Sequence, residues 1–168
     1  MVKFWDTSAV MPLLVVESTS DALRQAAKSD TQMVAWWGTR IECVSAITRR
    51  ARENGLSAAD RAQARQELAV LAAHWSEVQP TDEVRTMAER IVSVHSLRAA
   101  DAIQLAAAMA ASDGATANLP FVSLDTRLRE AAVREGFTVL PATAARATAL
   151  RERAPRRKQI GRSRRARP

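Results

Sequence analysis

Four carboxylic acids lie within or directly after apolar segments of the sequence: Asp6, Glu42, Asp101 and Asp125. Burying one unpartnered carboxylate is costly, and four held together repel one another unless a cation compensates their charge. Ligation by carboxylate oxygens suits a hard cation such as Mg²⁺ or Mn²⁺. Such a metal can activate a water molecule and stabilise charge on a phosphodiester, so no side chain has to act as the nucleophile. The four acids therefore predict a metal site if the fold brings them together.

Each acid also has a simpler interpretation when it is taken alone. Asp6 and Asp125 could cap the helices that follow them, which is the commonest use of aspartate before a helix. Glu42 could be an exposed helix acid, and Asp101 could pair with Arg98 three residues earlier. The metal hypothesis consequently depends on the combination of the acids and on their placement in the fold.

The elements that must position these acids follow from the pattern of apolar residues and stop signals. Strands are expected at residues 2–5, 32–37, 77–80, 120–124 and 137–140. Helices are expected at residues 18–27, 38–55, 57–75, 81 onward, 97–112 and 126–135, whereas residues 6–8 indicate only a turn or a helix start. Strands that alternate with helices predict an α/β fold around a parallel sheet. Ligand sites in such sheets lie beyond the carboxyl ends of the strands, where Asp6 and Asp125 fall.

Two of the expected helices carry further predictions. The helix at 97–112 is apolar on nearly all sides, so it should be buried around Asp101. Cys43, in the helix at 38–55, is expected to be a buried thiol rather than a nucleophile. In the same helix, Ile41, Val44, Ile47 and Ala51 are expected to lie along one face.

The positive charge of the protein is concentrated at one end of the sequence. The chain of 168 residues has a formal net charge of +7, yet residues 151–168 alone contain nine Lys or Arg and one acid. The remaining 150 residues are therefore close to neutral. Residues 1–142 are expected to form one domain and residues 143–168 a flexible basic tail, which could bind a polyanion or simply be solvated.

Composition excludes several classes of protein. A hydrophobic content of 47% is typical of a globular chain. The single cysteine excludes a disulfide framework and fits a reducing compartment, which predicts a cytoplasmic protein. The longest apolar runs are too short to span a membrane, and Asp6 lies where the apolar region of a secretory signal would begin.

The segments around the four acids resemble PIN domains, and more narrowly the VapC toxins of bacterial type II toxin–antitoxin systems. The resemblance extends over about residues 2–141 and is carried by residues 6–8, 37–46, 97–106 and 121–128. Each motif alone is weak, but four in the right order, each with its acid, are specific. The residues that match the family's acids are Asp6, Glu42, Asp101 and Asp125, and Ser8 matches the hydroxyl that often assists the metal shell.

This resemblance implies a three-layer α/β/α sandwich around a short parallel sheet, with Mg²⁺ or Mn²⁺ held by the acids. It implies an endoribonuclease that cuts structured RNA such as tRNA or rRNA and so inhibits translation. It also implies a homodimer that is neutralised by a cognate VapB-type antitoxin and contacts operator DNA only through the antitoxin complex. The basic tail departs from the family pattern, so no role is carried over to it.

Contacts to the RNA must come from other residues than the acids. Arg40, Arg98 and Arg127 lie near the motif acids and could bind phosphates, although ordinary surface charge explains them equally well.

Two other functions stay open at this point. One is a PIN-like module that has lost catalysis and binds RNA, DNA or an antitoxin. The other is a Mg²⁺-dependent phosphatase, which usually shows Asp-x-Asp after the first strand, whereas Ser8 occupies the second position here.

Overall fold

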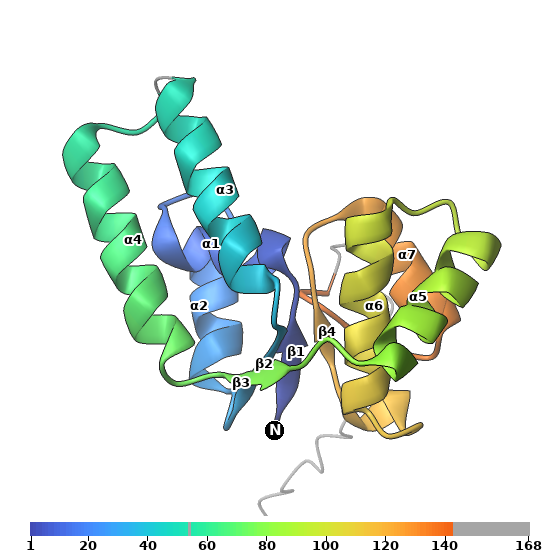
Figure 1. Ribbon diagram of the computed structural model, residues 1–168. Helices are drawn as coiled ribbons and strands as arrows, with labels where there is room; N and C mark the ends of the chain where they lie inside the picture. Colours follow the sequence, from blue (N-terminus) through green and yellow to red (C-terminus); the bar gives the residue numbers. More distant parts are fainter. Residues whose placement is uncertain (54, 143–168) are drawn as a thin grey trace, which may run out of the picture.

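A sheet of five parallel strands forms the centre of the part of the chain that the structure describes (Figure 1). The structure is a computed structural model that describes residues 1–53 and 55–142, so the predicted basic tail lies outside the described residues. The strands are β1 (Lys3–Trp5), β2 (Met33–Trp36), β3 (Ser76–Val78), β4 (Phe121–Val122) and β5 (Val139–Leu140). Their order is β3-β2-β1-β4-β5, with Phe4 paired to Val34 on one side and Phe121 on the other. The predicted α/β class is therefore confirmed.

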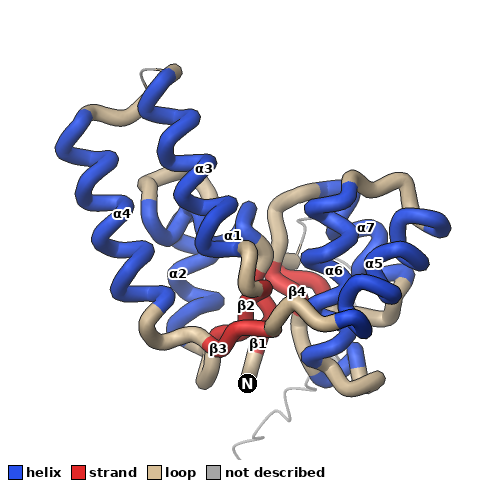
Figure 2. Tube along the Cα trace, viewed as in Figure 1, coloured by secondary structure: helices blue, strands red, loops and turns tan. Residues whose placement is uncertain are grey.

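Helices connect these strands along the described chain (Figure 2). They are α1 (Thr7–Leu14), α2 (Ser20–Lys28), α3 (Thr39–Arg52), α4 (Ala58–Ala72), α5 (Asp82–Val94), α6 (Ala99–Ala111) and α7 (Thr126–Arg134), with a short 3₁₀ turn at Thr116–Asn118. Side-chain caps explain where several begin. The Ser57 hydroxyl accepts the Asp60 N–H at the start of α4, and the Thr81 hydroxyl accepts the Val84 N–H at the start of α5.

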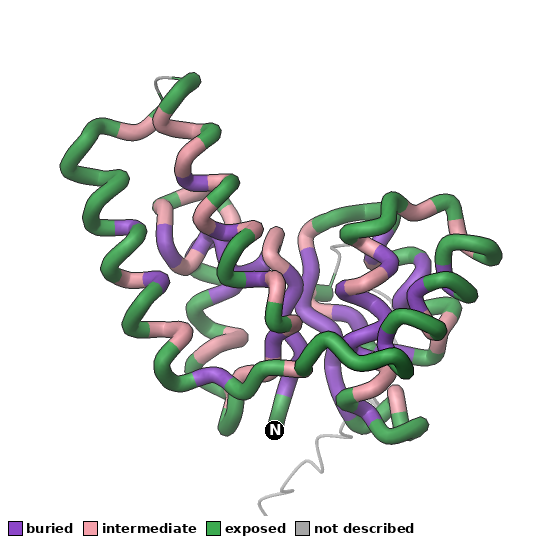
Figure 3. Tube along the Cα trace, in the orientation of Figure 1, coloured by how far each residue is buried: buried purple, intermediate pink, exposed green. Residues whose placement is uncertain are grey.

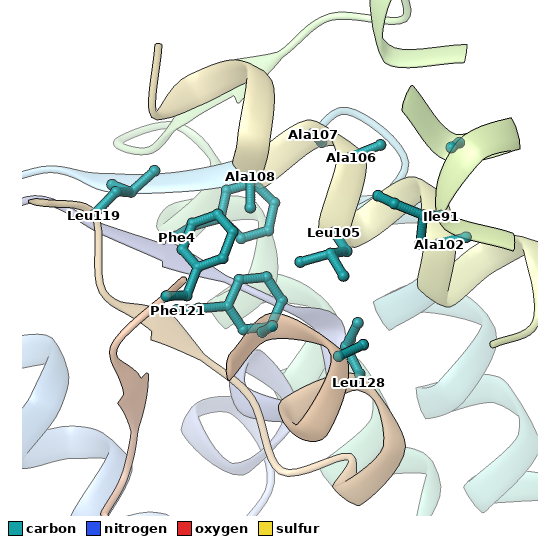
Figure 4. Close-up of a cluster of buried hydrophobic side chains, with 14 of the residues drawn as sticks. Phe4, Ile91, Ala102, Leu105, Ala106, Ala107, Ala108, Leu119, Phe121 and Leu128 are labelled. Atoms are coloured by element: carbon teal, nitrogen blue, oxygen red, sulfur yellow. The ribbon is translucent and has the colours of Figure 1, made fainter. Parts of the chain in front are cut away.

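The helices cover both faces of the sheet, which gives the three-layer sandwich. Successive strand residues point to opposite faces, so Phe4 and Phe121 join one core while Trp5 and Val122 join the other. The first core is completed by α5, α6 and α7, and the second by α1 to α4. Figure 3 shows the buried residues concentrated along the sheet and on the helix faces against it. In Figure 4, the rings of Phe4 and Phe121 lie beneath the small alanines of α6, and they stack with centroids 5.5 Å apart.

The strand order changes direction between β1 and β4. From β1 the chain moves outward to β2 and β3, and then returns through α5 and α6 to place β4 on the other side of β1. Connections on the two sides of this point leave the sheet over opposite faces. A crevice opens beyond the carboxyl ends of the strands at such a switch point, and this is where ligands bind in open α/β sheets.

Residues 7–14 form the helix α1, so of the two possibilities that the sequence left open at residues 6–8, the helix start is confirmed. Pro12 lies inside this helix, and proline removes a backbone donor, so the local signal for a helix is weak. The helix expected to end near Trp75 ends at Ala72, because Trp75 turns into the core and its indole N–H donates to Glu77.

The buried face of α3 coincides only in part with the apolar face expected from the sequence. Thr39, Cys43 and Ile47 are completely buried at a spacing of four residues, which is one face of a helix. Ile47 belongs to both faces, whereas Ile41 is 59% exposed and points away from the buried face. The buried thiol at Cys43 and the buried helix around Asp101 are confirmed. No helix among the described residues is long and apolar enough to cross a membrane.

Candidate active site

One pocket of about 610 Å³ brings the four predicted carboxylates together at the switch point. Asp6 and Asp125 enter it directly after β1 and after the β4 segment, while Glu42 comes from α3 and Asp101 from α6. Figure 1 shows α3 and α6 on opposite sides of the line along which β1 and β4 end. The acids are far apart in sequence, and only the parallel sheet with its crossover brings them to one place.

Asp6 is buried at the end of β1 and is held by two hydroxyl groups. Ser8 and Ser123 both donate to its Oδ2 atom, the Ser123 bond measuring 2.7 Å. Burial raises the pKa of Asp6 to about 6, and the nearby charge of Glu42 adds to the shift, while the two serine hydrogen bonds oppose it. The Asp6 side chain makes no cap to α1, so the simple capping interpretation does not explain this residue.

Glu42 lies in the first turn of α3 and is held by a polar network. The Thr7 hydroxyl and the Gln104 amide both donate to its Oε2 atom, the amide at 2.8 Å. Gln104 is only 1% exposed, and its amide group also contacts the hydroxyls of Thr7 and Thr39 at 3.0 and 3.2 Å. A buried amide in an apolar helix is costly unless it is hydrogen-bonded, so this network fixes the Glu42 carboxylate in one place.

Asp101 lies in the first turn of α6, half-buried in the pocket. Burial raises the pKa of Asp101, and the negative charge of Asp125 raises it further. The positive charges of Arg98 and Arg127 act in the opposite direction. Asp101 and Asp125 are therefore close enough to repel each other, which is the electrostatic situation that a bound cation relieves.

Asp125 has two environments at once. Its Oδ1 atom accepts the Leu128 N–H at 2.8 Å and so caps α7, which agrees with the simpler interpretation for this residue. Its own backbone N–H lies 3.2 Å from the Ser8 hydroxyl and 3.1 Å from the Ser123 hydroxyl. The same two serines therefore connect Asp6 to Asp125 across the ends of β1 and β4.

The donor chemistry of the pocket fits Mg²⁺ or Mn²⁺. All four acidic groups are carboxylates, which are hard oxygen donors. Burial raises the pKa of both Asp6 and Asp101, and the charges of Glu42 and Asp125 add to the respective shifts, so a cation in the pocket would stabilise their ionised forms. Across residues 1–53 and 55–142, however, no three Asp, Glu, His or Cys side chains lie close enough together to form a metal site by themselves. The four carboxylates therefore line one pocket, but no three of them are close enough to bind one cation directly.

Sequence reasoning missed several residues of this pocket and its surroundings. Gln104 and Ser123 hold the carboxylates, and Glu17, Arg49 and Arg50 line the same pocket. Two signals could have identified some of them. Gln104 is a polar residue in an apolar helix, three positions after Asp101 and therefore on the same face as that acid. Arg49 follows Glu42 by seven residues, which places these two residues on one face of their own helix.

The three arginines predicted to contact RNA lie outside the pocket lining. Arg40, Arg98 and Arg127 are all exposed. Arg98 and Arg127 are nevertheless close enough to Asp101 to lower its pKa. Their predicted contact with phosphates stays a prediction. Cys43 takes no part in this chemistry, because burial raises the pKa of its thiol to about 12.

Solved structures share this fold, although no family model and no curated relative matches the sequence. VapC20 of Mycobacterium tuberculosis, a sarcin-ricin loop cleaving toxin, has a TM-score of 0.61 at 16% identity over 84% of this chain and 100% of its own. A toxin–antitoxin complex from Klebsiella pneumoniae has a TM-score of 0.54 at 14% identity, covering 74% of this chain and 88% of its own. VapBC2 of Rickettsia felis, bound to a fragment of promoter DNA, has a TM-score of 0.52 at 11% identity over the same shares. At such identities the likeness concerns the fold, and it confirms the PIN-like α/β/α architecture.

Proposed function

We propose that this protein is a VapC-type toxin, a metal-dependent endoribonuclease that cuts structured RNA such as tRNA or rRNA and inhibits translation in the bacterial cytoplasm. One observation carries the proposal. Asp6, Glu42, Asp101 and Asp125, selected from four separate segments of the sequence, line one pocket at the switch point of the sheet. The shared fold with VapC20, a toxin that cleaves the sarcin-ricin loop, supports it.

Some residues of the pocket would bind the cation, and others would orient these ligands or the attacking water. Mg²⁺ or Mn²⁺, when bound, supplies Lewis-acid activation of water and stabilisation of charge on the phosphate. Asp6, Asp101 and Asp125 would hold the cation directly or through water. Glu42, whose Oε2 atom is fixed by Thr7 and Gln104, would complete the cluster or orient the attacking water. The Ser8 hydroxyl supports this arrangement by donating to Asp6.

The proposed partners follow from the same interpretation. A cognate VapB-type antitoxin would neutralise the toxin, and the complex would contact operator DNA through the antitoxin. The likeness to the Klebsiella pneumoniae complex supports the antitoxin, and VapBC2 bound to promoter DNA supports the operator contact.

A homodimer is also part of the proposal, and the structure offers a surface for it. An apolar groove of about 560 Å³ lies between α5 and α6, on the side of the sheet opposite to α3. It is lined by Trp36 and Val84 among others, and Val92 on its edge is 46% exposed. Exposed aliphatic and aromatic side chains around a groove are typical of protein interfaces.

The proposed function is tested by incubating antitoxin-free protein with total cellular RNA in Mg²⁺, in Mn²⁺ or in EDTA, and by sequencing the new 5′ ends. Discrete cuts that need the metal are expected from the wild type, and Asp101→Asn should abolish them. Asp82→Asn is the matched control, because Asp82 is also an acid in the first turn of a helix but is exposed and outside the pocket.

The other outcomes are equally informative. Cleavage that persists in folded Asp101→Asn would contradict the assigned role of the carboxylates. Absence of cleavage from folded wild type with either metal would contradict the nuclease and favour a catalytically inactive module that binds RNA, DNA or an antitoxin.

A further inference from the structure

One face of α3 runs from the carboxylates to a pair of arginines. Five of its residues line the active-site pocket: Glu42, Ser45, Ala46, Arg49 and Arg50. Spacings of three, four and seven residues place them in one stripe along the helix. At a rise of 1.5 Å per residue, Arg49 lies about 10 Å along the helix from Glu42. The pocket therefore has an acidic end near the strands and a basic end further along α3.

The two arginines at the basic end differ in their contacts. Arg50 pairs with Glu17, which follows α1, at 2.5 Å, and about a third of each side chain is exposed. This pair fixes the Arg50 guanidinium at the wall of the pocket. Arg49 is exposed and makes no ion pair with any residue of the described chain. Its charge is therefore available to a ligand that lies in the pocket.

We propose that Arg49 and Arg50 form a subsite for a backbone phosphate next to the one that is cut in the RNA substrate. The inference rests on the proposed function and assigns the contact that the acids cannot make, since carboxylates repel a polyanion. A guanidinium presents several N–H donors in a planar fork that matches a phosphate, so arginine suits this contact better than a point charge would. A phosphodiester chain that enters the acidic end continues along α3 to the arginines.

The test measures RNA binding apart from cleavage. Asp101→Asn serves as the background, and the probe is a fluorescein-labelled RNA hairpin with a uridine loop. Adding Arg49→Gln should weaken binding about tenfold, the lower end for a lost hydrogen bond between charged groups. The slope of log K against log salt should also become shallower by about 0.7, the change expected for one phosphate contact to a single strand.

The controls separate this contact from general charge. Arg65→Gln on α4 removes another exposed arginine outside the pocket, so it should change affinity and slope much less. In the cleaving protein, Arg49→Gln should raise KM while kcat at saturating RNA stays close to that of the wild type. Because Arg49 is exposed, the thermal midpoint should not move.

Several results would overturn the subsite. Unchanged RNA affinity and slope in Arg49→Gln, with a wild type that cleaves RNA, would contradict this inference alone. An equal loss of RNA affinity in Arg65→Gln would mean that the effect of Arg49→Gln comes from the change in net charge and not from a specific contact. Competition by poly-glutamate as strong as by RNA of equal charge would indicate an acidic peptide as the occupant. A wild type that neither binds nor cuts RNA would overturn the proposed function and this subsite together.

Discussion

Gln104 donates a hydrogen bond of 2.8 Å from its buried amide to the Oε2 atom of Glu42, across 62 positions of sequence. Asp101 precedes Gln104 by three residues on α6, so one helical turn carries both a pocket carboxylate and the group that positions another. Since Glu42 belongs to α3, this bond connects the helix layers on the two faces of the sheet.

Replacing Gln104 by leucine should therefore lower metal-dependent cleavage 10- to 100-fold, roughly the loss seen when a group that orients metal ligands is removed. Binding of Mn²⁺, measured by calorimetry, should weaken as well. In the Glu42→Gln background the same change should have little further effect on Mn²⁺ affinity. Gln63→Leu is the control, because Gln63 makes the same kind of bond to Glu67 on an exposed face.

Two substitutions separate the role of Asp125 as a helix cap from its role as a charged residue of the pocket. Asn is as good a helix cap as Asp, so Asp125→Asn should keep the stability of the fold and lose activity. Asp125→Ala removes the cap to Leu128 as well, and it should cost a further 0.5–2 kcal/mol or so in urea unfolding. Equal stability of the two variants would mean that the cap contributes nothing, and full activity of Asp125→Asn would exclude the charge from catalysis.

The ion pairs of Glu135 predict a loss of stability in acid. The Arg90 Nη2 atom lies 2.7 Å from Oε2 of Glu135, and the His95 Nε2 atom lies 2.7 Å from Oε1. Hydrogen bonding to Arg90 lowers the pKa of Glu135 below its ordinary value of 4.5, and the contact with His95 lowers it further. A depressed pKa means that the ionised carboxylate stabilises the native state above pH 4.5, and that this contribution is lost as the pH falls below that value.

Glu135→Gln should consequently destabilise the protein at neutral pH, and the difference from wild type should shrink below pH 4.5. Urea unfolding at a series of pH values measures it. Glu130→Gln, an exposed glutamate on α7, should show no such trend. A difference that stays constant with pH would contradict the assignment.

Gly136 has both a backbone and a steric reason to be glycine. Its φ is 90°, and a Cβ there would lie 2.8 Å from the Thr116 hydroxyl. Gly114 has a similar φ of 77° but open space around it. Alanine at either position should cost about 1–2 kcal/mol for the left-handed backbone, and Gly136→Ala should cost more. Adding Thr116→Ala should recover the excess, as thermal unfolding can measure, and no recovery would contradict the steric part.

The proposed homodimer can be checked at the groove between α5 and α6. One chain has a mass of 18.4 kDa, so light scattering after size exclusion distinguishes one copy from two. Val92→Asp puts a charge at the edge of the groove and should give monomers. Val70→Asp, at an exposed valine on α4, should leave the dimer intact. A wild type with the mass of one copy would overturn the proposal.

The positions of the four acids could be predicted because each depends on a local signal. Asp6 and Asp125 follow short apolar runs that are typical of strands, and parallel strands end at one edge of a sheet. The order of strands and helices could be predicted from equally local signals. One example is Thr81, whose hydroxyl caps the start of α5. The neighbours of the acids depend on tertiary packing instead. Nothing near Ser123 in the sequence indicates that its hydroxyl binds Asp6, 117 positions away.

Burial decides the details that local patterns leave open. Ile41 and Ile47 belong to one apolar face of α3 in the sequence, but packing against α1 and α4 buries Ile47 together with Cys43 and leaves Ile41 exposed. The sequence indicated that a helix could start after Asp6 but not how far it extends, because Pro12 lies inside α1; burial of Val10 and Met11 stabilises this helix in the fold.

The two hydrophobic cores each carry half of the acidic pocket. Asp6 and Glu42 are anchored to the layer of α1–α4, whereas Asp101 and Asp125 belong to the helices of the opposite layer. A ligand that contacts all four carboxylates thus connects the helix layers on the two faces of the sheet, in addition to the hydrogen bond from Gln104 to Glu42. Its binding should therefore slow amide hydrogen exchange in α3 and α6 together, which hydrogen exchange with and without Mn²⁺ can measure.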